Sequence, residues 1–189
     1  DITVGTDMGV CEAVVNWDEP TFSDNCPGAS VTSTASSGDT FELGTNTVTY
    51  TVTDNEGNTT ECSFDVTVED REPPMVTGCP DNIVVPNDPG ACSAIVSWEP
   101  PTFTDNCEIL NIDSKPNPGS LFPIGTTNVV YEAVDADGNI TTCTFTVTVE
   151  DTEDPMLTCP ADITVSNDDG ECGAIVNWAP PIPIDNCGA

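Results

Sequence analysis

Hydrophobic and polar residues alternate strictly along several short stretches of this chain. The alternation covers residues 143–149 and recurs at residues 62–68, and shorter alternating runs lie just upstream at 129–133 and 48–52. A period of two is typical of a half-buried β-strand. Between the later pair of stretches lies Asp-Ala-Asp-Gly-Asn at residues 135–139, a combination typical of tight turns. The pattern therefore predicts a β-hairpin, present once in each half of the chain.

A second alternating pair precedes the first. Residues 83–85 lead through the turn-like stretch Pro-Asn-Asp-Pro-Gly at 86–90 into residues 92–98, and we interpret this as another hairpin. No stretch has a helical period with caps. Several short strands within about 80 residues are typical of a β-sandwich, so the predicted fold class is all-β.

The chain repeats itself. The segment CEAVVNW at residues 11–17 recurs as CSAIVSW at 92–98 and as CGAIVNW at 172–178, and each copy is followed by Asp-Asn-Cys. Self-similarity at a fixed period indicates a tandem array. We assign residues 1–70 to a repeat lacking its N-terminal strand, 71–151 to a complete repeat, and 152–189 to the N-terminal half of a third. The chain is interpreted as a window on a longer array.

Charge and cysteine content then narrow the class of protein. Lys and Arg number 2 against 33 Asp and Glu, giving a net charge of −31. Such a surface repels nucleic acid and anionic membrane, and no long apolar run predicts a membrane span. The acidic surface attracts cations, although the same negative charge also keeps a protein soluble. Ten cysteines without any histidine indicate disulfides in an oxidising, extracellular or cell-surface location.

The strand faces suggest how the four cysteines of a repeat pair. Cys92 and Cys143 fall in phase with inward residues of different hairpins, so a bond between them would join the two sheets. Cys79 would lie opposite the end of the second hairpin, close to the loop that carries Cys107. We therefore predict first-to-third and second-to-fourth pairing. The predicted bonds are Cys11–Cys62, Cys79–Cys107, Cys92–Cys143 and Cys159–Cys187, which leaves Cys26 and Cys172 without partners.

Eight spaced motifs carry a family resemblance. They are Cys-Pro, Cys-x-Ala-x-Val-x-Trp, Pro-Pro, Asp-Asn-Cys, Phe-x-x-Gly-Thr, Val-x-Tyr, Asp-x-x-Gly-Asn and Cys-x-Phe-x-Val-x-Val, in that order. Together they resemble the hyalin repeat (HYR) domain over essentially the whole chain. The resemblance implies an immunoglobulin-like fold, an extracellular or cell-surface place, and a role in adhesion or matrix. It names no ligand and implies no catalysis.

Acidic linkers between repeats are candidate calcium sites. If successive units join end to end, each linker lies near the loops of the next unit, where carboxylate and amide oxygens would converge as calcium requires. The candidate ligands are Glu69, Asp70, Glu72, Asp105, Asn106, Asp135, Asp137, Asn139, Glu150, Asp151, Glu153, Asp185 and Asn186. Alternatively, these residues are ordinary turn formers, and no EF-hand spacing is present. No organic cofactor is expected.

Tryptophans and Asn-x-Thr sequons are two further kinds of candidate site. Trp17, Trp98 and Trp178 could bind sugar, but their phase with inward residues predicts that they are core. Asn58 and Asn139 head Asn-x-Thr sequons, so each is a candidate glycosylation site in a secreted protein.

Catalysis is not predicted. Without histidine the Ser-His and Cys-His arrangements are excluded, and every cysteine belongs to the repeat framework. We predict an extended extracellular stalk, fibre or filament, whose partners are neighbouring copies of the repeat or cell-surface and matrix components. The alternatives are a ligand- or carbohydrate-binding surface module and an accessory domain of a secreted enzyme.

Overall fold

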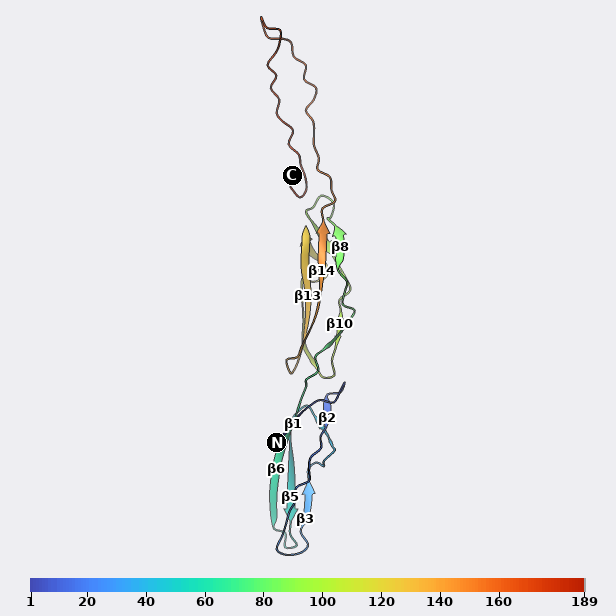
Figure 1. Ribbon diagram of the computed structural model, residues 1–189, viewed down its shortest axis with the longest axis vertical. Helices are drawn as coiled ribbons and strands as arrows, with labels where there is room; N and C mark the ends of the chain where they lie inside the picture. The colour runs from blue at the N-terminus through green and yellow to red at the C-terminus, as the bar shows by residue number, and fades with distance from the viewer. Residues whose placement is uncertain (189) are drawn as a thin grey trace. The chain divides into compact units, whose positions relative to one another are not determined.

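The computed structural model describes residues 1–188, and every regular element among them is a β-strand (Figure 1). The first repeat contains β1 (Ile2–Gly5), β2 (Glu12–Val14), β3 (Ser30–Ser33), β4 (Thr40–Glu42), β5 (Gly44–Thr53) and β6 (Thr59–Glu69). The second contains β7 (Met75–Thr77), β8 (Ile83–Pro86), β9 (Ser93–Val96), β10 (Thr102–Thr104), β11 (Ile109–Lys115), β12 (Ser120–Pro123), β13 (Gly125–Asp135) and β14 (Ile140–Glu150). The predicted all-β class is confirmed. Over residues 1–188 no helix has the length and apolar character of a membrane span.

The hairpins predicted from strict alternation are confirmed. Strands β5 and β6 pair antiparallel along their whole length, from Gly44 opposite Val68 to Thr53 opposite Thr59. In the second repeat, β13 and β14 are neighbours in one sheet. The turn between them needs a residue with positive φ, and Gly138 supplies it at 90°.

Each repeat buries one face of its long hairpin against a smaller sheet. In the first repeat the four-stranded sheet has the order β1-β6-β5-β3, and β2 pairs with β4 separately. Their inward side chains form one core, in which Val48 and Val66 are fully buried and Trp17 packs on the edge. In the second repeat the orders are β11-β13-β14-β8, β12-β9 and β10-β7. Two inward-facing sheets of this kind make a sandwich.

The second predicted hairpin is wrong. Strand β8 does not pair with β9: it runs parallel to β14, with Ile83 beside Val147, whereas β9 pairs antiparallel with β12. The chain therefore changes sheets between residues 86 and 93. The same crossing occurs in the first repeat, where β1 pairs with β6 and β2 with β4. A turn-rich connection between two alternating stretches is compatible with either arrangement.

The predicted disulfides are also wrong. The change of sheet between β8 and β9 explains why Cys79 bonds to Cys143 rather than to Cys107. The structure contains Cys79–Cys143, Cys11–Cys107 and Cys92–Cys187. Ile83 and Val147 lie side by side in the parallel pair. Cys79 comes four residues before Ile83, and Cys143 comes four residues before Val147. The two cysteines therefore also lie side by side, with Cα atoms 5.8 Å apart. The predictions Cys79–Cys107 and Cys92–Cys143 both assumed a hairpin that does not form.

The other two predicted bonds, Cys11–Cys62 and Cys159–Cys187, assumed pairing inside one repeat. In the structure Cys11 and Cys92 bond to cysteines of the following repeat instead. The cysteines without a partner are Cys26, Cys62, Cys159 and Cys172, all exposed. Cys26 and Cys172 were expected to lack partners.

The third repeat forms almost no regular structure. Among its described residues the β-pairing is limited to an isolated bridge between Met156 and Ile184, and a turn at residues 168–173 forms two further backbone hydrogen bonds. In the second repeat, β8 and β9 depend on β14 and β12, and the sequence has no third copy of either partner. Trp178 is accordingly 64% exposed, so its predicted core position is wrong for this copy. Trp17 and Trp98 do pack edge-on against phenylalanine rings of their own repeats.

The compact units do not follow the repeat boundaries. One unit contains residues 1–79, 101–115 and 130–143, and the other contains 80–100, 116–129 and 144–189. The first unit therefore combines the whole first repeat with part of the second, and the other unit combines the rest of the second repeat with the third. The first contains the loops that receive the linker after β6, and the second contains the linker after β14.

Candidate cation site at the repeat junction

The first linker begins with a buried acid. Asp70 follows β6 directly and is 4% exposed. Its Oδ1 accepts hydrogen bonds from the Glu72 backbone nitrogen at 3.1 Å and from the Asn106 amide at 3.2 Å, with Thr6 Oγ1 at 3.4 Å. An Asx turn of this kind fixes the side chain close to its own backbone. Only one carboxylate oxygen is used in this way, and the other faces inward.

A second acid comes from the Asp-Asn-Cys motif after β10. Asp105 Oδ1 accepts a hydrogen bond from the Cys107 backbone nitrogen at 2.9 Å, again as an Asx turn. Asn106 directs its amide nitrogen to the Val10 carbonyl of the preceding repeat at 3.2 Å, as well as to Asp70. The motif therefore orients one oxygen of each polar side chain away from these bonds.

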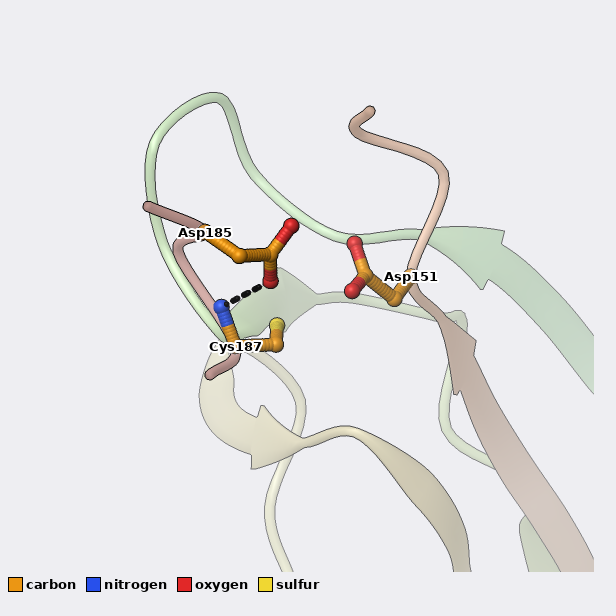
Figure 2. Close-up of side chains that lie close together, drawn as sticks. All are labelled: Asp151, Asp185 and Cys187. Carbon is orange, nitrogen blue, oxygen red and sulfur yellow. Dashed lines mark hydrogen bonds between the residues drawn. The ribbon is translucent and has the colours of Figure 1, made fainter. Parts of the chain in front are cut away.

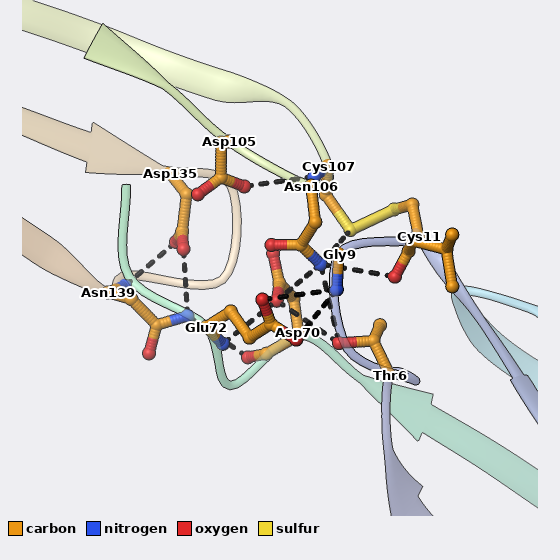
Figure 3. The surroundings of a disulfide bond; sticks show 11 residues. Thr6, Gly9, Cys11, Asp70, Glu72, Asp105, Asn106, Cys107, Asp135 and Asn139 are labelled. Atoms are coloured by element: carbon orange, nitrogen blue, oxygen red, sulfur yellow. Dashed lines mark hydrogen bonds between the residues drawn. A yellow bond between two sulfur atoms is a disulfide. The ribbon is translucent and has the colours of Figure 1, made fainter. Parts of the chain in front are cut away.

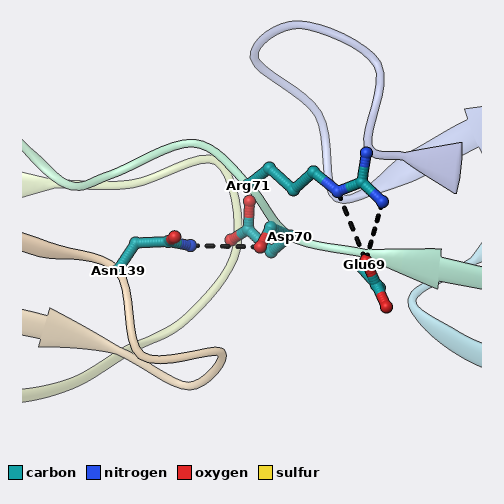
Figure 4. A network of polar contacts seen from close by, with 4 residues as sticks. All are labelled: Glu69, Asp70, Arg71 and Asn139. Carbon is teal, nitrogen blue, oxygen red and sulfur yellow. Dashed lines mark hydrogen bonds and ion pairs between the residues drawn. The ribbon is translucent and has the colours of Figure 1, made fainter.

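The third acid closes the hairpin between β13 and β14. Asp135 is fully buried, and its two oxygens accept hydrogen bonds from the backbone nitrogen and the side-chain amide of Asn139, both at 2.7 Å. Asn139 also donates to the carbonyl oxygen of Asp70 at 3.1 Å (Figure 4). The turn thus connects the linker to the hairpin and holds the carboxylate in place.

These three carboxylates converge (Figure 3). Asp70, Asp105 and Asp135 each offer an oxygen, and the three oxygens lie within 4.8 Å of one another. Asp70 Oδ2, Asp105 Oδ2 and Asn106 Oδ1 are buried and have no hydrogen-bond donor. A buried oxygen without a partner costs free energy, and a buried carboxylate costs more. The arrangement therefore lacks a positive charge, and a cation would supply it.

No basic side chain among the described residues compensates this cluster. Arg71 is adjacent in sequence, but it forms an ion pair with Glu69 at 2.8 Å (Figure 4). Burial raises the pKa of Asp105 above its ordinary value of 3.8, and the charges of Asp70, Asp135 and Glu72 raise it further. The cluster thus favours whatever neutralises it, which is a proton in acid or a bound cation near neutral pH.

The preceding repeat contributes contacts that sequence reasoning missed. The carboxylate of Glu72 accepts from the Gly9 backbone nitrogen at 3.1 and 3.3 Å. The disulfide Cys11–Cys107 lies beside Asn106, whose amide nitrogen is 3.5 Å from Cys107 Sγ (Figure 3). The turn at Asp7–Val10 recurs in every repeat, always followed by cysteine. That constant spacing was the available signal.

The second junction repeats the arrangement in part. Asp151 and Asp185 lie close together beside Cys187 (Figure 2), and Asp185 Oδ1 accepts from the Cys187 nitrogen at 2.8 Å. Glu153 accepts from the Gly90 nitrogen at 2.8 Å, as Glu72 does from Gly9. Asn186 donates to the carbonyl of Ala91 at 2.9 Å. The sequence supplies no equivalent of Asp135 here, and Asp151 is exposed.

Several predicted ligands lie outside both clusters. Glu69 is engaged by Arg71, and both Asp137 and Glu150 are exposed, in the turn and at the end of β14 respectively. Glu72 and Glu153 hold glycine backbones of the preceding turn rather than joining the acids. The predicted glycosylation sites remain predictions. A glycan on Asn139 would replace its bonds to Asp135 and Asp70, whereas Asn58 is exposed.

These features define a class of protein: tandem immunoglobulin-like β-sandwiches, stapled by disulfides and extracellular. A family model described as "HYR domain" matches residues 1–68 and 69–149. The chain therefore belongs to the HYR domain family, as its motifs predicted.

Two curated relatives are named Hyalin. The one from Strongylocentrotus purpuratus is 40% identical over 81% of this chain and 13% of its own length. The one from Lytechinus variegatus is 35% identical over 99% of this chain and 36% of its own length. A rat protein named "Sushi, von Willebrand factor type A, EGF and pentraxin domain-containing protein 1" is 35% identical over 79% of this chain and 4% of its own. The chain thus spans only a minor part of each relative.

Solved structures match weakly. The protocadherin gamma B4 extracellular domain matches 83% of this chain and 32% of its own, at a TM-score of 0.34 and 16% identity. The human desmocollin-1 ectodomain matches 82% of this chain and 40% of its own, at 0.31 and 15%. TM-scores of this size carry no weight for the fold, which is described from its own strands.

Proposed function

We propose that this chain is a structural and adhesive segment of an extended extracellular stalk, fibre or filament, and that calcium bound at the repeat junctions rigidifies it. The observation that carries the calcium proposal is the set of three buried oxygens without donors, on Asp70, Asp105 and Asn106. A surface that is acidic only for solubility has no reason to bury its carboxylates together.

The chemistry of the donors selects the ion. All candidate ligands are carboxylate or amide oxygens, and a hard cation such as calcium takes six to eight oxygens in a flexible geometry. The cysteine beside the site is bonded as a disulfide, so no thiolate is available to favour zinc. Asp70, Asp105, Asp135 and the Asn106 carbonyl oxygen would hold the ion, with backbone oxygens or water completing the shell.

A cation at this place would join two repeats. Asp70 belongs to the linker, Asp105 and Asp135 to loops of the following repeat, and Asn106 also contacts Val10 of the preceding one. Prolines at 73 and 74 restrict the linker further. The supporting relatives are HYR proteins such as the hyalins, and we propose neighbouring copies of the repeat or cell-surface and matrix components as partners. We propose no catalytic activity.

The test is a calcium titration followed by heat unfolding. With a dissociation constant near 0.1 mM, typical of extracellular sites, 10 mM calcium would stabilise the junction by about 2.7 kcal/mol. We expect a calcium-dependent rise in Tm and saturable heat in calorimetry, both reversed by chelator. Asp105→Asn should weaken both.

The matched control is Asp24→Asn. Asp24 occupies the same motif position in the first repeat, but it is exposed and no linker covers it in this structure. It should leave calcium binding unchanged. Equal loss in both variants would mean that calcium only screens surface charge, and no calcium effect in the unaltered chain would overturn the proposal.

A further inference from the structure

Two of the three disulfides join successive repeats at equivalent positions. Cys11 bonds to Cys107 across 96 residues, and Cys92 bonds to Cys187 across 95 residues. In both cases the cysteine after the first turn of one repeat meets the Asp-Asn-Cys cysteine of the next. The Cα atoms lie 4.9 and 4.8 Å apart, within the usual range for disulfides. The two bonds therefore connect equivalent positions at the two junctions between repeats.

Within each repeat, the two cysteines of this kind are close in sequence. They are 15 residues apart in all three copies, since 26 minus 11, 107 minus 92 and 187 minus 172 are equal. The third disulfide, Cys79–Cys143, stays inside the second repeat and serves only that domain.

We propose that these bonds form a second covalent thread along the array, in which each repeat contributes only its 15-residue segment between two inter-repeat disulfides. The main chain passes through every strand, whereas the thread passes from Cys11 to Cys107, back along the chain to Cys92, and on to Cys187. The thread deepens the stalk proposed above by specifying what bears tension, but it is independent of calcium.

The thread limits how far the protein can be stretched. Pulled from its ends, the oxidised chain can extend only the ten residues before Cys11, the 15 between Cys107 and Cys92, and the two after Cys187. An extended chain spans at most about 3.5 Å per residue, so these residues and two disulfides allow about 100 Å. The reduced chain of 189 residues allows about 650 Å by the same measure. Of the described strands, only β1, β9 and β10 lie on this path, and the others are shielded from the load.

The same rule assigns the exposed cysteines at 26 and 172. Cys26 occupies the Asp-Asn-Cys position and Cys172 the first-turn position, and both are exposed and unpaired. The thread continues if each bonds to the complementary cysteine of an adjoining repeat. Forming such a bond removes two protons and two electrons from two thiols. Thiol–disulfide exchange passes them to a disulfide oxidant, which is reduced to two thiols.

Force spectroscopy on this chain tests the thread. Free thiols are first capped by alkylation, handles are attached at the two ends, and the maximum extension is measured in chelator with and without reductant. We expect a hard stop near 100 Å when oxidised and about 650 Å when reduced. A stop near 650 Å in both states would overturn the proposal.

Paired cysteine variants provide matched controls. Removing the first inter-repeat bond, by Cys11→Ser with Cys107→Ser, should move the stop to about 330 Å. Removing the second, by Cys92→Ser with Cys187→Ser, should move it to about 300 Å, because the shortest path then runs through Cys79–Cys143. Removing the bond inside the repeat, by Cys79→Ser with Cys143→Ser, should leave it near 100 Å, because that bond is not on the shortest path. The opposite ranking would contradict the thread.

Peptide mapping under non-reducing conditions is a second test that needs no variant to fold. The expected cross-linked peptides join Cys11 to Cys107 and Cys92 to Cys187. Recovery of Cys11–Cys62 or Cys92–Cys143 instead would overturn the thread. Calcium indifference with intact cross-links would overturn only the function proposed above.

Discussion

The two junctions of this chain share most of their parts, but the sequence stops at residue 189, before any residue equivalent to Asp135 could follow Cys187. Both have an aspartate at the start of the linker, a glutamate that holds the preceding turn, an Asp-Asn-Cys loop and a disulfide to the previous repeat. Only the first also has Asp135 from a hairpin turn. Asp70 is buried there, and its counterpart Asp151 is exposed.

The difference shows what the hairpin turn contributes. The disulfide and the linker glutamate bring two repeats together without it, because both are present at the second junction. At the first junction the turn also contacts the linker, since Asn139 donates to the carbonyl of Asp70. The disulfide and the cluster of three acids are therefore separate parts of the first junction, and each can be altered alone.

The largest expected effect on stability comes from replacing a linker aspartate by asparagine. Asp70→Asn keeps the oxygen that accepts from Glu72 and turns an amide toward Asp105, so it should stabilise the calcium-free chain. It should also remove most of the calcium-dependent stabilisation, about 2 kcal/mol. Asp151→Asn is the matched change at the incomplete junction and should alter neither quantity by more than about 0.5 kcal/mol. Equal effects of the two variants on heat unfolding would contradict the claim that only the first junction of this chain binds calcium.

The sequence predicted the hairpins because strict alternation and an Asp-x-x-Gly-Asn turn are local signals. It could not show that β8 and β9 separate into different sheets. The connection at residues 86–90 has the composition of a hairpin turn, and its path is decided by the parallel pairing of Ile83 with Val147, 64 residues away. A pairing between residues so far apart in sequence produces no recognisable pattern in the residues of the connection.

The acids of the candidate site could be predicted from the sequence, but the disulfide beside them could not. Asp70, Asp105 and Asp135 follow from the expectation that a linker meets the loops of the next repeat. The disulfide prediction failed because it confined each bond to one repeat, although four cysteines at constant positions allow bonds between repeats equally well. The similar offsets of 96 residues from Cys11 to Cys107 and 95 from Cys92 to Cys187 are visible in the sequence, but only the structure selects these pairs.

Acidity should affect the complete junction with a definite sign. The pKa of Asp105 is raised, so the folded chain binds protons more readily than the unfolded chain between pH 3.8 and the folded pKa. Without calcium, its contribution to stability should be present at low pH and be lost as pH rises through the folded pKa. The pKa of Asp54 is lowered by hydrogen bonds from Asn58, which acts in the opposite direction.

Calcium and protons should therefore compete at the first junction. The calcium-dependent rise in Tm should shrink as pH falls through the pKa of Asp105, by at most tenfold in affinity per pH unit for one proton. Asp105→Asn should remove this pH dependence from whatever binding remains. A calcium affinity that stays constant as pH falls through the folded pKa of Asp105 would place the ion away from Asp105.

The smallest expected effect concerns what the junctions share. Glu72 and Glu153 accept hydrogen bonds from the backbones of Gly9 and Gly90 in the same way, and these contacts are exposed. Glu72→Ala and Glu153→Ala should each destabilise the chain by about 0.5–1 kcal/mol in chelator. The two losses should be similar, because neither bond depends on the third acid. If Glu72→Ala alone also abolished calcium binding, Glu72 would be a ligand in the bound state, and the glycine contact would describe only the calcium-free junction.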